Sequence, residues 1–85
     1  MKTFNYTIKD ELGIHARPAG MLAKAAKALD SDVTITKGEK TVGAAKLMAL
    51  MGLGVKCGDV ITVTIEGGNE EVSEQTMKEF FETNL

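Results

Sequence analysis

The sequence is poor in the residues that build disulfides, metal centres and membrane spans. Its 85 residues include one cysteine, one histidine, one proline and no tryptophan. Cys57 alone cannot form an internal disulfide and suits a reducing compartment, and one cysteine with one histidine cannot supply a structural zinc site. No apolar run approaches the roughly 20 residues that span a bilayer, and the first ten residues lack the apolar core of a signal peptide. We therefore expect a cytoplasmic protein with no metal and no direct membrane insertion.

Charge and length narrow the class of protein further. Ten basic and twelve acidic residues give a net charge of -2. No block of like charge dominates, so nucleic acid is not the expected partner. A chain of this length builds one core but does not enclose a substrate in a deep cavity. We expect a single domain over residues 1–85 with its chemistry at the surface, which favours a carrier or a binding module.

The apolar periodicity predicts four strands and three helices. Alternating apolar residues indicate strands at 4–8, 33–36 and 60–66, and Gly38 is the expected turn residue of a hairpin that leads into a fourth short strand. Apolar positions at steps of three and four indicate helices over 16–29, over about 45–51, and after Asn69. The order βαββαβα predicts an α+β fold of two layers, with a mostly antiparallel sheet covered by helices on one side.

The stretch "ELGIHARPAG", residues 11–20, holds the chain's only histidine and only proline. Pro18 falls in the first turn of the expected helix, where its missing N–H costs nothing, and His15 then lies at the helix start beside Arg17. A neutral imidazole there can attack an electrophilic phosphorus, and the unpaired N–H groups can stabilise the phosphorylated ring. The alternative is that His15 only caps the helix or makes a hydrogen bond in a turn.

The segment "GIHARPAG" resembles the phosphorylation-site motif of HPr, the histidine-containing phosphocarrier family of the bacterial phosphoenolpyruvate-dependent sugar phosphotransferase system. The likeness extends over nearly the whole chain and includes "DSDVTI", "KGEKTV" and "CGDVITVTIEG". It implies an open-faced two-layer β-sandwich, in which three helices cover one face of a four-stranded antiparallel sheet. It also implies a carrier without a cofactor or turnover of its own.

The same resemblance assigns roles to the residues of the motif. His15 accepts a phosphoryl group at Nδ1 from phosphorylated enzyme I and passes it to a sugar-specific enzyme IIA. Arg17 neutralises the transferred group, Pro18 shapes the helix start, and the backbone N–H groups of Ala16 and Arg17 point at the phosphate. We expect the carrier to be a monomer.

A docking face is expected next to the motif. Arg17, Gly20, Lys24 and Lys27 follow one another at steps of three, four and three, so they lie on one side of the first helix. The family places the short helix beside them, and exposed methionine and leucine rimmed by lysine suit an acidic partner. Some residues of a two-turn helix must point inward, so the alternative is that its apolar residues are core. The expected partner-binding residues are Gly20, Lys24, Lys27, Lys46, Leu47, Met48 and Met51.

Two positions depart from the family pattern. Many members from Gram-positive bacteria carry a regulatory serine where this chain has Lys46, so we expect no control through serine phosphorylation here. Sugar-system members often have a polar residue at the position of Leu12, whereas nitrogen-related paralogues often have leucine. One alternative is therefore a regulatory or nitrogen-type paralogue that signals through phosphorylated His15 without sugar transport. Another is a small-ligand-binding α+β domain unrelated to phosphate.

Overall fold

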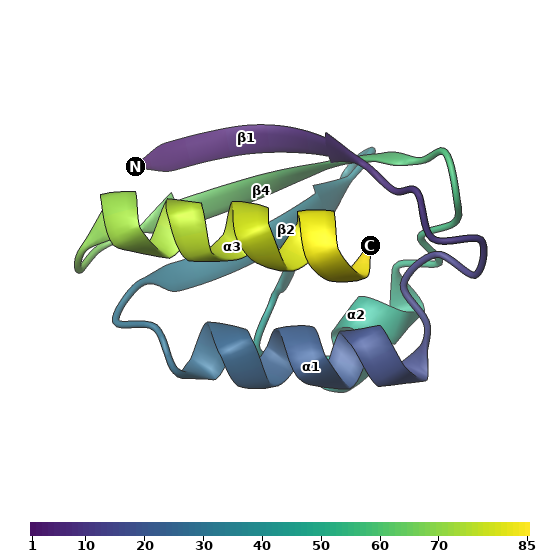
Figure 1. The fold of residues 1–85 in the computed structure, drawn as a ribbon, viewed down its shortest axis with the longest axis horizontal. Coiled ribbons are helices and arrows are strands. Elements are labelled where there is room, and N and C mark those ends of the chain that lie inside the picture. Colours follow the sequence, from purple (N-terminus) through teal and green to yellow (C-terminus); the bar gives the residue numbers. More distant parts are fainter.

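The computed structural model describes residues 1–85 and contains four strands and three helices (Figure 1). In chain order they are β1 (Lys2–Thr7), α1 (Ala16–Lys27), β2 (Asp32–Lys37), β3 (Lys40–Gly43), α2 (Leu47–Gly52), β4 (Val60–Glu66) and α3 (Glu70–Asn84). The predicted order βαββαβα is confirmed. The differences lie at element ends: α1 stops two residues before Leu29, and α2 begins at Leu47, with Lys46 as its N-cap.

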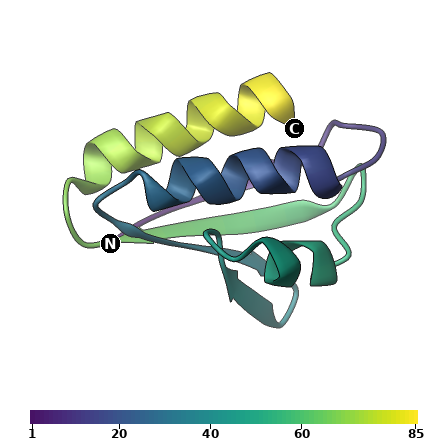
Figure 2. The same cartoon turned by 90° about the horizontal axis from the view of Figure 1, so that it is seen from below.

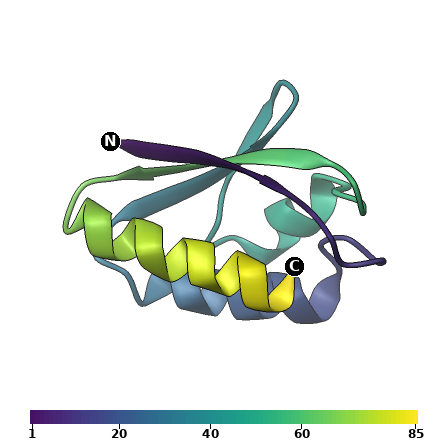
Figure 3. The ribbon, with the colours of Figure 1, turned by 45° about the horizontal axis from the view of Figure 1, so that its top comes forward.

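The four strands form one antiparallel sheet in the spatial order β1-β4-β2-β3. In the central strand β4, Val63 lies opposite Phe4 of β1 and opposite Ile35 of β2, so these three side chains share one face. All three helices cover that face, and the other face is open (Figures 1 and 2). The β2–β3 hairpin extends beyond the rest of the sheet (Figure 3). The expected open-faced, two-layer α+β fold is confirmed.

The alternating strands divide the sheet into a dry and a wet face. The residues of β2 and β4 that face the helices are buried, and they are all β-branched: Val33, Ile35, Ile61, Val63 and Ile65. The residues between them, which lie on the open face, are the half-buried Thr34, Thr36, Thr62 and Thr64. Because β-branched side chains pack well on a pleated surface, both faces favour strand over helix in these segments.

One apolar cluster joins the sheet to the helices. Helix α1 contributes the small side chains of Ala19, Ala23 and Ala26, which let the helix approach the sheet closely. Helix α3 contributes Phe81, whose ring centroid lies 5.3 Å from that of Tyr6, and the Tyr6 hydroxyl donates a 3.0 Å hydrogen bond to the Phe81 carbonyl. Burial of such a side chain stabilises the fold by about 1.5 to 3 kcal/mol. None of the helices has the length and apolar character that crossing a bilayer requires.

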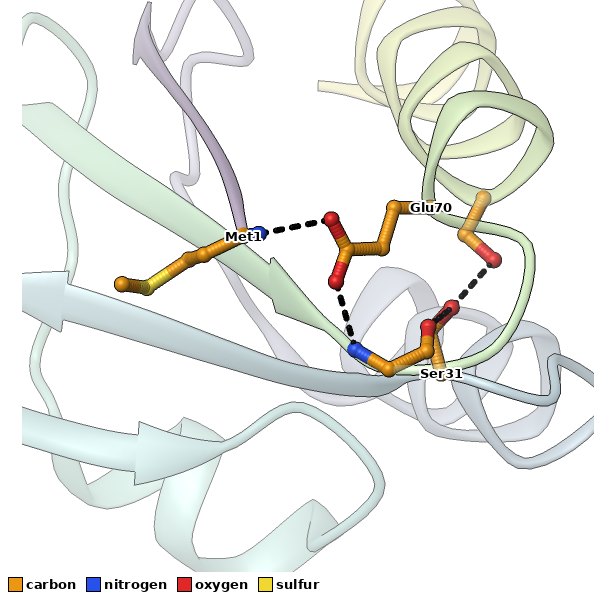
Figure 4. Close-up of polar contacts among 5 residues, drawn as sticks. Met1, Ser31 and Glu70 are labelled. Atoms are coloured by element: carbon orange, nitrogen blue, oxygen red, sulfur yellow. Dashed lines mark hydrogen bonds and ion pairs between the residues drawn. The ribbon is translucent and has the colours of Figure 1, made fainter.

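A polar cluster closes the end of the molecule at which α1 finishes (Figure 4). Ser31 Oγ donates to the Gly67 carbonyl oxygen at 2.6 Å and lies 2.8 Å from Ser73 Oγ. The Glu70 carboxylate accepts the Gly67 N–H at 2.7 Å and pairs with the Met1 ammonium, also at 2.7 Å. These two contacts lower the pKa of the Glu70 carboxyl, and the ammonium has the larger effect. Since both serines are buried, they serve to tie the loop before β2 to the start of α3.

Candidate functional site

The start of α1, helix α2 and the end of α3 lie together at the other end of the molecule, on the right of Figure 1. The segment that leads from β1 to α1 is held there by hydrogen bonds to Leu85. The N–H groups of Lys9 and Asp10 both donate to the Leu85 carbonyl oxygen, at 2.6 and 2.9 Å. On its other side, the Ile8 carbonyl accepts the Gly58 N–H at 2.8 Å. The loop before the histidine is therefore held from two directions.

A tight turn at Gly13 delivers the chain to the helix start. Its φ of 67° is in the left-handed region, and a Cβ at this position would overlap the carbonyl of Val55 and come within 2.7 Å of Lys56 Cα. The turn is closed by hydrogen bonds from the Leu12 N–H to Asp10 Oδ1 and from the Gly13 N–H to the Asp10 carbonyl, both 2.9 Å. Only glycine fits this position, because the backbone is left-handed and another backbone segment lies against it.

His15 is the N-cap residue of α1. Its backbone is extended, with φ −104° and ψ −176°, and its side chain makes no capping hydrogen bond. The first hydrogen bond of the helix joins the Ala19 N–H to the His15 carbonyl at 2.9 Å. Pro18 has no N–H, so the Ala16 and Arg17 N–H groups are the two donors of the first turn without a carbonyl partner in the helix. The imidazole thus stands beside two backbone donors of the kind that bind anions.

His15 lines an open cavity of about 310 Å³. Its lining brings together residues from three parts of the chain: Asp10, His15, Arg17, Pro18, Met21, Thr83 and Asn84. The structure therefore places the predicted His15, Arg17 and Pro18 at one cavity. Sequence reasoning missed Asp10, whose Oδ1 lies 3.9 Å from His15 Nε2, and the polar side chains that α3 contributes. An aspartate whose side chain can accept the N–H two residues later is a local turn signal, but nothing local to α3 marks Thr83 or Asn84.

The predicted docking residues lie on the surface of α1 and α2, which pack beside each other (Figure 2). Lys24, Lys27 and Lys46 are exposed, and a Cβ on the half-buried Gly20 would meet no atom within 4 Å. The apolar residues of α2 are exposed as well: Leu47 by 40%, Met48 by 80% and Met51 by 42%. The expectation that some of these three must point inward is wrong, because Leu50 fills the inward position of this short helix.

Lys46 caps α2 without a side-chain hydrogen bond. Its φ of −106° and ψ of 99° are extended, and its alkyl chain passes within 4 Å of the position that a Cβ on Gly43 would occupy. The ammonium stands near the start of a helix, where a cation is mildly unfavourable, by about 0.3 to 1 kcal/mol when exposed. Helix stability does not explain the choice of lysine at this position.

A carboxylate braces the loop that packs against the Gly13 turn. Asp59 Oδ2 accepts the Lys56 N–H at 2.8 Å and lies 3.0 Å from Lys37 Nζ, which also donates to the Gly54 carbonyl at 2.8 Å. The Lys56 N–H first, and the Lys37 ammonium second, lower the pKa of the Asp59 carboxyl. These contacts join the end of β2 to the loop before β4. That loop packs against the Gly13 turn, which leads to His15.

Comparison with known proteins finds relatives along nearly the whole chain. The family model described as the PTS HPr component phosphorylation site matches residues 2–83. The phosphocarrier protein HPr of Mycoplasma genitalium is 38% identical over 85 residues, covering 99% of this chain and 97% of that protein; HPr of Mycoplasma capricolum is 35% identical over 79 residues, covering 93% and 89%.

Solved structures share the fold as well. HPr-C-His from Thermoanaerobacter tengcongensis superposes with a TM-score of 0.92 at 34% identity, over 98% of this chain and 93% of that one. An HPr dimer from the same organism superposes with a TM-score of 0.76, also at 34% identity, over 98% and 95%.

Proposed function

The chain belongs to the HPr family of phosphocarrier proteins of the phosphotransferase system, and from that premise we propose that His15 carries a phosphoryl group from phosphorylated enzyme I to a sugar-specific enzyme IIA. One observation carries the proposal: the imidazole lies in an open cavity, at the N-cap of α1, next to Arg17 and two unpaired backbone N–H groups. The carrier has no turnover of its own, because it returns to its starting state only when an acceptor removes the phosphoryl group.

The transfer follows from the placement of these groups. The lone pair of His15 Nδ1 attacks phosphorus in line, and the bond between phosphorus and the donor atom of enzyme I breaks as the new nitrogen–phosphorus bond forms. The Ala16 and Arg17 N–H groups and the Arg17 guanidinium stabilise the negative charge on the phosphoryl oxygens. The same groups hold the phosphorylated product, and the cavity is open, so that a partner's acceptor group can reach the phosphorus.

A docking surface next to the cavity supports the partner assignment. We define it as Arg17, Gly20, Lys24 and Lys27 of α1 with Lys46, Leu47, Met48 and Met51 of α2. Its centre is apolar and adaptable, and its rim is cationic. Such a surface fits a partner with an apolar patch that is bordered by carboxylates.

Phosphorylation by enzyme I tests the proposal directly. The protein is incubated with phosphoenolpyruvate and enzyme I, and the intact mass is followed before and after mild acid. We expect one added phosphoryl group, lost in acid and never gained by His15→Ala. A protein that stays unmodified while a known HPr is phosphorylated in the same mixture would overturn the carrier assignment and leave a binding module.

A second candidate, the nitrogen-type pathway, is favoured by one observation. Leu12 is 71% exposed and lies three residues before His15, where an approaching enzyme IIA can contact it. Transfer from the phosphorylated protein to a sugar-specific and to a nitrogen-type enzyme IIA, measured side by side, separates the two pathways. Faster transfer to the nitrogen-type acceptor, reversed in Leu12→Ser, would replace the sugar pathway with the alternative.

We also propose that the carrier acts as a cytoplasmic monomer. The cavity and the docking surface are both built by a single chain, and one apolar cluster runs through it from Ile8 to Leu85. Since a related HPr forms a dimer, the mass in solution needs a measurement. Light scattering after size exclusion should give the mass of one chain at micromolar concentration, and twice that mass would contradict the proposal.

A further inference from the structure

We propose that Asp10 is a positioning residue for phosphoryl transfer, which holds the Nε2 side of the His15 ring so that Nδ1 presents its lone pair to phosphorus. The inference rests on the proposed carrier function and assigns a task to a residue outside the "GIHARPAG" segment. It is carried by the geometry of the loop between β1 and α1, which aims one carboxylate at one edge of the ring.

The carboxylate and the ring lie close without being in contact. Asp10 Oδ1 is 3.9 Å from His15 Nε2, and the two side chains are 30% and 36% exposed. A hydrogen bond needs about 2.7 to 3.2 Å, so a small rotation of the ring or a bridging water completes the contact. Hydrogen bonds at catalytic groups are often long in a free protein and tighten when the partner binds.

Asp10 is held where it is by the backbone around it. Its N–H donates to the Leu85 carbonyl, its own carbonyl accepts the Gly13 N–H, and its Oδ1 accepts the Leu12 N–H at 2.9 Å. Because three hydrogen bonds fix the residue, the carboxylate is less mobile than a side chain at the tip of a loop. Its orientation toward the ring is a property of the turn.

Asp10 is also the only acidic group that lines this cavity. The β1–α1 segment contributes Asp10 and His15, and α1 contributes Arg17. From α3 the cavity receives Thr83 and Asn84, which are uncharged. The Nε2 edge of the ring therefore has one carboxylate partner, and the helix N-terminus is left to the phosphoryl group.

The chemistry explains why such a partner matters. A neutral imidazole carries one proton, and a carboxylate beside Nε2 favours the tautomer in which that proton is on Nε2 and the lone pair is on Nδ1. When the Nδ1–phosphorus bond forms and the bond between phosphorus and the donor atom of enzyme I breaks, the ring keeps the Nε2 proton and gains positive charge. The carboxylate stabilises that charge, as an aspartate does for the histidine of a serine protease. In the second transfer the Nδ1–phosphorus bond breaks and the ring returns to neutral.

The test separates the charge of Asp10 from its part in the turn. Asp10→Asn keeps an oxygen that can accept the Leu12 N–H but removes the charge, and Glu11→Gln removes one charge from the exposed neighbour as a matched control. Single-turnover transfer from phosphorylated enzyme I is measured over a range of carrier concentrations, and ring ¹⁵N shifts report the tautomer of His15. Thermal unfolding verifies that both variants are folded.

We expect Asp10→Asn to lower the transfer rate constant at saturation about fivefold to tenfold, because the ring's partner charge is half-exposed rather than buried. Its affinity for enzyme I stays that of Glu11→Gln, and its ¹⁵N shifts move toward the tautomer with the proton on Nδ1. Equal rates in the two variants, an equal loss in both, or a loss without a tautomer change would overturn the assignment. If wild type itself accepts no phosphoryl group, the carrier function fails, and the ¹⁵N comparison still decides whether Asp10 sets the tautomer.

Discussion

Gly13 shows how much of the site depends on one residue without a side chain. Its left-handed backbone and its contact with the Val55 carbonyl bring Ile14 and His15 to the start of α1. The Ile14 N–H then donates to that same carbonyl at 3.2 Å. The position of the imidazole is therefore set by the backbone of a loop some forty residues further along the chain.

Gly13→Ala should destabilise the protein by about 2 to 4 kcal/mol, because a left-handed alanine is strained and its Cβ overlaps backbone that cannot move aside. Gly38→Ala is the matched control. Gly38 has a φ of 61°, but a Cβ there would meet no atom within 4 Å, so the cost should be only about 1 to 2 kcal/mol. Urea denaturation measures both. Equal losses would show that the contact with Val55 has no part in the effect.

Gly20 presents the opposite case, a glycine that the fold does not require. It lies within α1, and a Cβ would enter open space. Gly20→Ala should raise the free energy of unfolding by about 0.5 to 1 kcal/mol, because alanine loses less backbone entropy in a helix. Affinity for enzyme I, measured by calorimetry, should fall severalfold, because the methyl group separates two closely packed surfaces. Unchanged affinity would remove Gly20 from the docking surface.

At the scale of elements, the short helix α2 leaves most of its apolar residues on the surface and buries few of them in the core. A helix of six residues has one inward side chain, Leu50, and its stability comes from packing rather than from propensity. Met48→Ala should therefore leave the urea midpoint nearly unchanged and weaken binding to enzyme I about tenfold, as truncation at the centre of an interface does. Val72→Ala changes another exposed apolar residue, on α3, and should leave binding unchanged. Equal effects of the two variants on binding would place the interface elsewhere.

The Asp59 carboxylate holds the loop before β4 in place, so part of the free energy of unfolding depends on pH. The pKa of Asp59 lies below its usual value of about 3.8 in the folded protein, chiefly through the Lys56 N–H and then through Lys37. Its contribution is thus fully present above that value and is lost as the pH falls through the folded pKa. Asp59→Asn should be less stable than wild type at pH 6, and the difference should shrink at pH 3. Urea denaturation at both pH values measures it, with Glu39→Gln at the exposed hairpin tip as control. A difference that stays constant with pH would contradict the role of the charge.

At the scale of the molecule, periodicity and one motif predict the elements, their order and the placement of His15, Arg17 and Pro18 together at the start of α1. They succeed because each strand alternates cleanly and because Pro18 marks a helix start whatever surrounds it. They do not predict the cavity. Thr83 and Asn84 line the cavity with His15 only because the end of α3 packs back onto the segment after β1, and no local pattern encodes that packing. Asp10 is placed by the turn before Gly13, but the sequence does not show that its carboxylate lies beside the ring. The sequence also does not show that Leu47, Met48 and Met51 are all exposed, because this depends on Leu50 alone reaching the core from α2.

The charge of the whole molecule hides a strong asymmetry. The net charge is -2, but the docking surface carries four cations, whereas α3 carries most of its charge as glutamate: Glu70, Glu71, Glu74, Glu79 and Glu82. A partner with carboxylates at its interface is therefore attracted to one side and repelled by the other. This field orients the approach of the partner and raises the association rate at low salt, although the carrier as a whole is acidic.

The association rate constant with enzyme I should fall about tenfold between 50 mM and 500 mM salt, because ions screen this attraction beyond roughly 5 Å at the higher concentration. The double variant Lys24→Gln, Lys27→Gln should associate severalfold more slowly at 50 mM and depend less on salt. Lys40→Gln, which neutralises an exposed lysine near the tip of the β2–β3 hairpin, is the matched control and should behave as wild type. Stopped-flow measurement with a labelled enzyme I gives all three rates. If the control slows as much as the double variant, net charge guides association and the cationic rim of α1 does not.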